Sequence, residues 1–587
     1  MSLATVAEPL SAPHSDSSID PRIDPHADPL ADAAPFGSRG IISAADRFDQ
    51  GPRPLRVAIV GGGPRGLWAL QELSRTLGQQ HRPVAVEVTL FEPHSRPGAG
   101  WIYDPAQQPV LRMNLANRHI DCGSERFVDW LDRNDYDADP EAFQSRAVAG
   151  KYLSDCFEQT VEALPSDIGL TVRPRRVVAC EADDDGWRLE MAGGAAERFD
   201  EVLLTVGHAG SGPGDDCEAD IRGIFPTALR LCESAVPAGS RTAVRGFALT
   251  GIDAIMALTE GRGGRFVDDG ERMTYEASGR EPASITPFSR TGQPMCVKPT
   301  RAVNERPGTE ALWLRGREEI AKLVAAESPS TAAIEAVVLD AAAARWKLDR
   351  GQQRMINGPR PDLSVRLHQA SQTESVPVDW VRSLREADGR DPIGLEQSLG
   401  AAWRMLYPAI VDAVSYGRLP SDQVRSFRSL AAKCERFAFG PPADSVRRVL
   451  ALVDAGIVRF DHAASPTIGR TPEGWQLDGD AFDTLVDARI ASAGIAALPA
   501  DSLLGRLIAD GTVEVDADWD AIRSARDGSV APGLALVGRA AEGWVLGHDS
   551  LSRAMHEQLP RWAAGIAERV CRAGGGRVSV PLAAVAR

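Results

Sequence analysis

The chain has 587 residues, which corresponds to roughly three or four domain-sized units rather than one hydrophobic core. Its formal net charge is -16, and it contains no block of Lys and Arg of the kind that binds polyanions. These features argue against nucleic acid or an anionic membrane as the main partner. No apolar run reaches the ~18 residues that cross a bilayer, and the amino-terminal residues lack the pattern of a secretory signal.

Residues 1–50 are rich in Pro, Asp, Ser and Ala, which bury too little surface to offset chain entropy, and we expect them to be mostly disordered. The eight cysteines form no CxxC pair, which excludes a zinc ribbon or a dithiol redox centre. Scattered cysteines without an export signal indicate reduced thiols in a cytoplasm. The ten histidines show no HExxH spacing, and we expect no metal site.

The strongest signal is a glycine-rich turn that follows this segment. A β-type apolar run at 57–60 leads directly into GxGxxG, and a helical pattern of leucines comes next. In such a turn Gly61 makes the tight bend, Gly63 lets the backbone approach a pyrophosphate, and Gly66 permits close packing of helix and strand. The N-terminus of the helix supplies N–H groups and a positive dipole end for the phosphates.

A second apolar run, at 84–91, ends in Glu92, which is placed to accept hydrogen bonds from ribose hydroxyls. The following residues favour a flavin nucleotide. The stretch ending in Trp101 is typical of the segment that covers the ribityl chain in FAD proteins. Val177 begins a run where an adenine contact is usual, and a later strand ends in Thr-x-Gly207, where the chain would pass the flavin again. Ordinary sheet strands are the alternative for the last two runs.

A second unit of strand, glycine turn and helix lies at 242–253. Gly246 and Gly251 have the spacing of a dinucleotide turn, but Ala248 stands where the middle glycine would be. This unit predicts a second nucleotide site, with one departure from the expected pattern.

The next strand, at 283–288, ends in Ser289 and Arg290. A basic residue at this position suits a 2′-phosphate, as an acidic residue suits a free 2′-hydroxyl. We therefore expect NADPH rather than NADH, with an ordinary αβ unit and a surface arginine as the alternative.

The carboxyl-terminal half differs from the residues before it in the spacing of its apolar residues. Residues 301–435 carry helical apolar spacing and resemble a helical insertion, a common place for substrate selection. Later a β run enters Gly538, and the stretch with Asp549, Ser550 and Leu551 precedes a long helix. In flavoproteins with two dinucleotide domains, this last strand and helix close the FAD site, and the helix dipole stabilises a reduced, anionic flavin.

The sequence thus predicts an α/β protein with two dinucleotide-binding, Rossmann-like domains, a helical insertion and a discontinuous FAD domain. The indicated boundaries are the FAD domain at 51–240 and 478–587, the NADPH domain at 241–300 and 436–477, and the helical substrate region at 301–435.

Several stretches together resemble the bacterial FAD-NAD(P)-binding flavoproteins related to the N-hydroxylating monooxygenases. These stretches are VAIVGGGPRGL, GAGWIYDP, LRMNLANRHID, FQSRAVAGKYL, VRGFALTGIDAIMALTEGRGGRF, FAFGPPADSV and GWVLGHDSLSR. Within this grouping the sequence looks most like the aspartate N-monooxygenases, which form nitrosuccinate from L-aspartate. The resemblance implies that NADPH reduces FAD, and that O₂ is then used to oxygenate the amine of a small amino acid.

The resemblance also indicates residues near the reaction centre. Asn114 matches the position where the family places an amide near the flavin, with a structural loop residue as the alternative. A dicarboxylic substrate requires cationic partners. Lys298 and Arg301 are the first candidates, followed by Arg112 and Arg118.

Two other functions remain open. The chain could be an NAD(P)H-dependent flavin oxidoreductase or a carbon hydroxylase; Baeyer–Villiger oxidation is disfavoured because no FxGxxxHxxxW pattern lies between the nucleotide motifs. From another class, the chain could bind FAD as a module without turnover, which the departure at Ala248 favours. NADPH oxidation by the purified yellow protein, with and without amino acids, separates these functions.

Overall fold

The computed structural model describes two parallel sheets, smaller antiparallel sheets and a set of packed helices. The described residues are 41–42, 53–79, 85–94, 96–123, 125–183, 185–207, 218–270, 272–327, 329–350, 367, 375–490, 494–548 and 550–573. Within them, no helix is both long enough and apolar enough to cross a membrane.

The first sheet has seven strands in the order β1-β4-β3-β2-β8-β21-β20. Its parallel strands are β2 (Leu55–Val60), β3 (Val86–Phe91), β4 (Ile168–Arg173), β8 (Glu201–Leu204) and β21 (Leu534–Leu536). The antiparallel edge strands are β1 (Ile41–Ile42) and β20 (Ser529–Ala531). Because β21 pairs with β8 across some 330 residues of chain, the first dinucleotide domain is discontinuous, as predicted.

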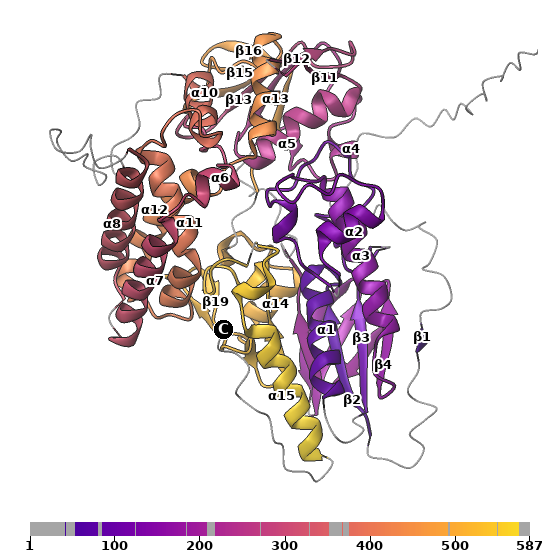
Figure 1. Cartoon of the computed structure of the whole chain (residues 1–587). Helices are drawn as coiled ribbons and strands as arrows, with labels where there is room; N and C mark the ends of the chain where they lie inside the picture. The colour runs from indigo at the N-terminus through magenta and orange to yellow at the C-terminus, as the bar shows by residue number, and fades with distance from the viewer. Residues whose placement is uncertain are drawn as a thin grey trace, which may run out of the picture. The chain divides into compact units, whose positions relative to one another are not determined.

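Helices cover this sheet because their apolar faces match its buried strands. The helices are α1 (Pro64–Gly78), α2 (Phe127–Arg133), α3 (Arg146–Glu162) and α15 (Gln558–Ala573), and α15 lies along α1 (Figure 1). From Val57 to Val60, strand β2 is apolar without alternation because both of its faces are buried there. A three-stranded antiparallel sheet of β5 (Val177–Asp183), β6 (Gly186–Met191) and β7 (Ala196–Phe199) is inserted between β4 and β8.

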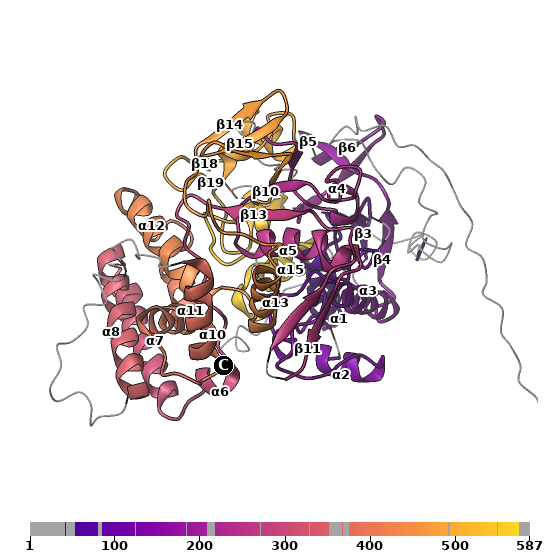
Figure 2. The same cartoon turned by 90° about the horizontal axis from the view of Figure 1, so that it is seen from above.

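The second sheet has four parallel strands in the order β13-β10-β17-β9. They are β13 (Ser284–Phe288), β10 (Arg241–Arg245), β17 (Thr484–Asp487) and β9 (Ile221–Arg222). Helices α5 (Leu249–Leu258) and α13 (Ala443–Asp454) pack in the same core, and Figure 2 shows β10 and β13 side by side. Two hairpin sheets flank it, β11 (Arg265–Asp268) with β12 (Met273–Glu276), and β14 (Ile468–Thr471), β15 (Gly474–Leu477) and β16 (Asp480–Phe482).

The pairing of strands corrects two of the predicted boundaries. Strand β17 falls in 478–587, the predicted second part of the FAD domain, yet it pairs with β10 of the second sheet. Strand β9 falls in 51–240, the predicted first part of the FAD domain, yet it pairs with β17. A buried parallel strand has the same apolar composition in either sheet, so its sequence does not reveal its partner.

The predicted helical insertion is present. Its helices are α6 (Arg301–Asn304), α7 (Thr309–Ala325), α8 (Thr331–Arg350), α10 (Val376–Ala387), α11 (Leu395–Val414) and α12 (Ser421–Ala438). Helices α7, α8, α11 and α12 pack together around a core that includes Trp313, Trp403 and Phe427 (Figure 2). Helix α10 differs, since its Trp380 packs in the core of the second sheet.

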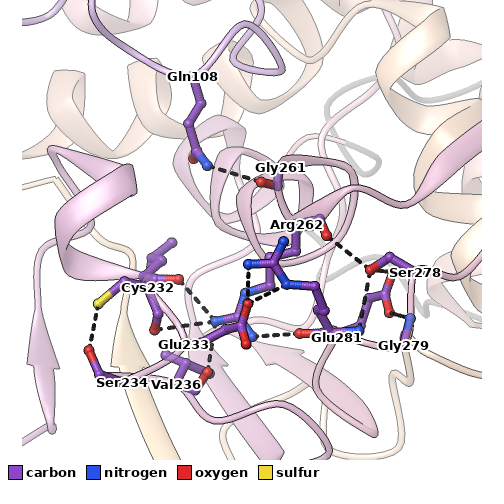
Figure 3. Close-up of polar contacts among 12 residues, drawn as sticks. Gln108, Cys232, Glu233, Ser234, Val236, Gly261, Arg262, Ser278, Gly279 and Glu281 are labelled. Carbon is purple, nitrogen blue, oxygen red and sulfur yellow. Dashed lines mark hydrogen bonds and ion pairs between the residues drawn. The ribbon is translucent and has the colours of Figure 1, made fainter. Parts of the chain in front are cut away.

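A buried arginine stabilises the loop that leads into β10. The Arg262 guanidinium donates hydrogen bonds to the carbonyl oxygens of Arg280 (3.0 Å), Leu231 (2.9 Å) and Val236 (2.7 Å) (Figure 3). Nearby, the Glu281 carboxylate accepts hydrogen bonds from the backbone N–H groups of Ser278 and Gly279. Burial lowers the pKa of Arg262. Its two terminal nitrogens donate to these carbonyl oxygens, whereas its buried Nε has no hydrogen-bond partner among the described residues. This cluster positions the second sheet.

The amino-terminal segment 1–50, predicted to be disordered, lies outside the described residues except for Ile41 and Ile42. These two residues pair with Leu170 and Thr171 of β4, so at this point the chain forms an edge strand.

Candidate functional site

The first glycine turn has the geometry of a nucleotide-binding loop. Gly61 has φ +110°, and a Cβ there would lie 2.4 Å from the Thr205 carbonyl oxygen. A Cβ on Gly66 would lie 2.2 Å from the Gly61 carbonyl oxygen. A Cβ on Gly63, by contrast, would have only the Gly100 Cα within 4 Å, at 3.7 Å. The fold itself therefore requires Gly61 and Gly66, whereas the space beside Gly63 fits a phosphate group.

The N-terminus of α1 is also suited to an anion. Its N-cap is Gly63, and within this fully described helix no side chain caps the free N–H groups and no acidic residue lies in the first turn. The N–H groups of the first turn and the positive end of the helix dipole therefore face the glycine turn without a side-chain cap. This end of the helix fits the pyrophosphate of FAD.

Glu92 lies at the end of β3, as predicted, and is held in place by the protein. One of its carboxylate oxygens accepts a hydrogen bond from Gly62 N (2.7 Å), and the other lies 2.6 Å from His94 Nδ1. Burial lowers the pKa of His94, but the hydrogen bond and charge of Glu92 more than offset this, so the net pKa is raised. The contact of Glu92 with a ribose stays a prediction.

The carboxyl-terminal segment reaches the same turn. The Thr205 hydroxyl donates to the Gly61 carbonyl (2.6 Å), and a Cβ on Gly538 would lie 3.1 Å from Arg65 Cγ. The Arg65 guanidinium donates to the carbonyl oxygens of His548 (3.3 Å) and Ser550 (3.0 Å). These contacts join the end of β21 and the segment after it to the start of α1.

The remaining residues that were predicted to bind the flavin lie in different environments. Gly207 has φ +62°, and Leu551 is buried in the core of the first domain. Val177 is buried in the same cluster as Val60 at the end of β2. Trp101 is 37% exposed, with its ring 5.9 Å from that of Phe225. Their roles in FAD binding stay predictions, as does that of Asp549, which lies outside the described residues.

The long helix predicted after the stretch with Ser550 and Leu551 is α15. After the stretch that includes Ser550 and Leu551, the chain forms a short 3-10 turn at Arg553–Met555, and α15 starts only at Gln558. Because the Ser550 carbonyl is bound by Arg65, it is this extended segment, rather than the helix N-terminus, that contacts α1 beside the glycine turn.

The second glycine turn reproduces the geometry of the first. Gly246 has φ +103°, and a Cβ on Gly251 would lie 2.1 Å from the Gly246 carbonyl oxygen. Ala248 has φ -75° and ψ -159°, close to the values of -72° and -167° at Gly63. Its methyl group is exposed. The substitution of alanine for the middle glycine therefore leaves the backbone of the motif unchanged.

Basic residues gather at the carboxyl edge of the second sheet. The adjacent parallel strands are β10, which ends in Arg245, and β13 and β17, which Arg290 and Arg489 follow. All three arginines therefore lie at one edge of the sheet. Arg290 is exposed, and its carbonyl accepts a hydrogen bond from the Ser465 hydroxyl (2.6 Å). Arg489 donates to Asp487 (2.8 Å). Sequence reasoning missed Arg489 because it did not place β17 in this sheet, and it did not single out Arg245 at the end of the predicted strand β10.

Asn114 lies where three parts of the chain meet. Its side-chain amide donates to the carbonyl of Phe439 (3.1 Å), at the end of α12, and its backbone carbonyl accepts a hydrogen bond from Lys298 Nζ. Its Oδ1 atom is buried and has no hydrogen-bond partner among the described residues. Lys298 follows β13 in the second domain. The structure thus brings together the two residues predicted for catalysis and substrate binding.

Arg404 of α11, which sequence reasoning missed, lies near this pair. Its guanidinium donates to the carbonyl of Ala438 (2.6 Å) and to Asn304 Oδ1 (3.1 Å). Burial, and next the charge of Arg404, lower the pKa of Lys298 to about 7. Burial likewise lowers the pKa of Arg404 to about 10. No sequence motif marks Arg404, because only tertiary packing brings α11 to Lys298.

The other predicted cations are less suited to a substrate. Arg301 pairs with Glu305 (2.7 Å) and has a side chain that is 55% exposed, and Arg118 pairs with Glu141 (2.9 Å). Arg112 is partly buried, which lowers its pKa. Among the described residues, no group of three or more His, Cys, Asp or Glu side chains is arranged to hold a metal ion.

Residues 58–209 match a family model described as FAD-NAD(P)-binding. This matched region contains the first glycine turn and most of the first sheet, and the prediction of FAD and NADPH as cofactors is confirmed. The glycine turn at 61–66 lies within the matched region.

Comparison with known proteins identifies the relatives of this chain. It is 29% identical over 271 residues to nitrosuccinic acid synthase of Aspergillus oryzae, covering 42% of this chain and 41% of that protein. It is 27% identical over 291 residues to L-aspartate N-monooxygenase (nitrosuccinate-forming) of Streptomyces davaonensis, covering 41% and 44%. An uncharacterized Escherichia coli protein is 24% identical over 479 residues, covering 74% and 83%. The match spans less than half of each named oxygenase, and the resemblance seen in the sequence is confirmed.

Proposed function

We propose that the protein is a FAD-dependent, NADPH-consuming monooxygenase that N-oxygenates a small amino acid, with L-aspartate as the first candidate substrate. The observation that carries this proposal is the contact of Asn114 with Lys298 in a chain that has two glycine turns of matching geometry. The names of the nitrosuccinate-forming relatives support aspartate.

When bound, FAD supplies the activation of O₂ with electrons from NADPH, and the protein supplies binding, orientation and exclusion of water. The N-terminus of α1 and the space beside Gly63 hold the pyrophosphate. Lys298 holds a substrate carboxylate through a charge-assisted hydrogen bond. The substrate amine must lose its proton before it is oxygenated, because an ammonium group has no lone pair to attack.

The test supplies NADPH, O₂ and L-aspartate to the purified yellow protein. We expect oxygen uptake that depends on aspartate, and mass spectrometry should detect hydroxylated or nitroso products that carry ¹⁸O from ¹⁸O₂. L-Asparagine is the matched control because it has nearly the same shape without the second carboxylate. NADPH oxidation that yields only hydrogen peroxide across a broad panel of amines would reject N-oxygenation and favour a flavin oxidoreductase.

A further inference from the structure

Lys298 and Arg404 are two neighbouring cations whose hydrogen bonds, within the part of the chain that the structure describes, go to neutral oxygen atoms. Lys298 donates to the carbonyl of Asn114, and Arg404 donates to the carbonyl of Ala438 and to Asn304 Oδ1. Among the described residues, neither forms an ion pair with a carboxylate. Most other arginines near the site do, including Arg301, Arg118 and Arg436.

This arrangement is unfavourable without an anion. Two like charges repel, and removing each from water adds a further cost that neutral hydrogen-bond partners offset only in part. Both effects lower the pKa of Lys298 to about 7, and no carboxylate counters them. Taken as whole residues, both are nevertheless half-buried rather than fully enclosed. An anion that enters from solvent would therefore find two cations and no competing carboxylate.

The surroundings indicate an amino acid rather than a simple ion. The Asn114 Oδ1 atom is a buried acceptor without a partner among the described residues, and its amide already donates to Phe439. An acceptor next to two cations complements a molecule with an N–H group and a carboxylate. The Phe143 ring, with its centroid 6.0 Å from Lys298 Nζ, provides an apolar wall.

We propose that Arg404 and Lys298 together bind the side-chain carboxylate of a dicarboxylic amino acid, so that helix α11 of the helical region selects the substrate. This inference rests on the proposed function, because it assigns a specificity site to it. The same anionic chemistry could come from a phosphate of NADPH. We favour the substrate because three other arginines are available for the phosphates of the coenzyme. They lie at the carboxyl edge of the second sheet and are Arg245, Arg290 and Arg489.

The experiment measures binding by calorimetry, on the FAD-loaded protein in the absence of NADPH, so that no turnover is needed. The ligands are L-aspartate, L-asparagine and succinate, with NADP⁺ in a separate arm. We expect wild-type protein to bind aspartate at least ten times more tightly than asparagine. Arg404→Gln and Lys298→Gln should each lose roughly ten- to a hundredfold in aspartate affinity, with asparagine and NADP⁺ binding unchanged.

Two further variants make the result specific. Lys298→Arg keeps a cation and should retain most of the preference for aspartate, which a merely structural role for Lys298 would not predict. Arg418→Gln removes an arginine that follows α11 and pairs with Asp412 (2.9 Å), and it should change none of the affinities. The flavin absorbance spectrum verifies that each variant is folded and loaded.

The outcomes separate the two proposals. If both glutamine variants keep the wild-type ratio of aspartate to asparagine affinity, or lose NADP⁺ binding instead, the carboxylate site is rejected, whether or not aspartate is oxygenated. If aspartate binds as described but no oxygenated product forms, the site stands and the N-monooxygenase proposal is rejected.

Discussion

Gly63 and Ala248 occupy the same position in the two glycine turns, with nearly the same φ and ψ. Neither backbone conformation requires glycine, since both φ values are negative. The difference between the turns is therefore the space that each leaves for its ligand. The first turn leaves room for a closely bound pyrophosphate, whereas the methyl group of Ala248 keeps the ligand of the second turn farther from the backbone.

This comparison predicts that Gly63→Val loses FAD without losing the fold. The new side chain meets no protein atom closer than 3.7 Å at Cβ, but it fills the phosphate space. We expect at least a tenfold weaker FAD affinity, about 1.4 kcal/mol, measured by flavin fluorescence. Because FAD itself stabilises the fold, the thermal midpoint should be compared with that of FAD-free wild type.

Gly66→Val is the matched control. Its Cβ would overlap the Gly61 carbonyl at 2.2 Å, so it should lower the thermal midpoint even without FAD. Normal FAD affinity in Gly63→Val would show that this turn is not the phosphate loop.

Arg290 should set the preference for NADPH over NADH. Its side chain is exposed after β13, so Arg290→Ala leaves the fold intact. Loss of a charge-assisted contact to the 2′-phosphate costs ~1.5–3 kcal/mol, or roughly ten- to a hundredfold. We expect the KM for NADPH to rise by this factor and that for NADH to stay nearly constant. Equal changes with both coenzymes would contradict the assignment.

At the scale of elements, a buried ion pair joins α3 of the first domain to α5 of the second. Arg146 lies 2.6 Å from Asp253, and their side chains are 14% and 7% exposed. Burial raises the pKa of Asp253 to about 6 even though Arg146 lowers it, so the desolvation of the carboxylate is large. A charge left without its partner here would be costly.

A double-mutant cycle tests this contact. We expect Arg146→Met and Asp253→Leu each to lower the free energy of unfolding by about 3–5 kcal/mol, because each leaves a buried charge unpaired. The double variant should lose less than either single variant. Additive losses, measured by urea denaturation, would indicate that the two side chains do not depend on each other.

Local sequence patterns predicted most of the helices and strands, but they did not predict which strands pair with one another in every case. The turns around Gly61 and Gly246 were predictable because strand, glycine spacing and helix are contiguous in the chain. The placement of β9 and β17 was not, because it depends on hydrogen bonds to strands far away in sequence. For the same reason Lys298 was found from its position after a predicted strand, whereas Arg404, inside a long helix, carried no local signal.

At the scale of the whole molecule, Lys298 of the second domain lies beside Asn114 of the first domain and near Arg404 of the helical region. If Lys298 binds the substrate there, kcat/KM for aspartate should have a bell-shaped dependence on pH. The substrate amine must lose its proton, from a pKa near ~8, so activity rises with pH. Free Lys298 has a pKa of about 7, and it holds a carboxylate only when charged, so affinity falls as the pH rises through that value. Besides burial, the charge of Arg404 favours the neutral form of Lys298. Burial, and next the charges of Arg118 and Lys298, lower the pKa of His119.

Steady-state kinetics in Lys298→Arg check this profile. A guanidinium stays charged throughout the accessible range, so the fall of kcat/KM at high pH should disappear while the rise remains. In the wild type, kcat alone should keep rising, because a bound carboxylate raises the pKa of Lys298. A wild-type kcat/KM that rises without a fall would contradict the proposed role of Lys298.

The pairing of β8 with β21 has a consequence for the order in which the protein is made. Strand β8 emerges from the ribosome about 330 residues before Leu536, which at ~5–20 residues per second is a delay of roughly 15–70 s. During that interval one edge of the sheet beneath the flavin nucleotide is unpaired, and the Arg65 contacts to His548 and Ser550 are missing. Nascent chains that end before β21 should therefore not retain FAD, so binding of the cofactor to a nascent chain indicates that β21 has been synthesised and has paired with β8.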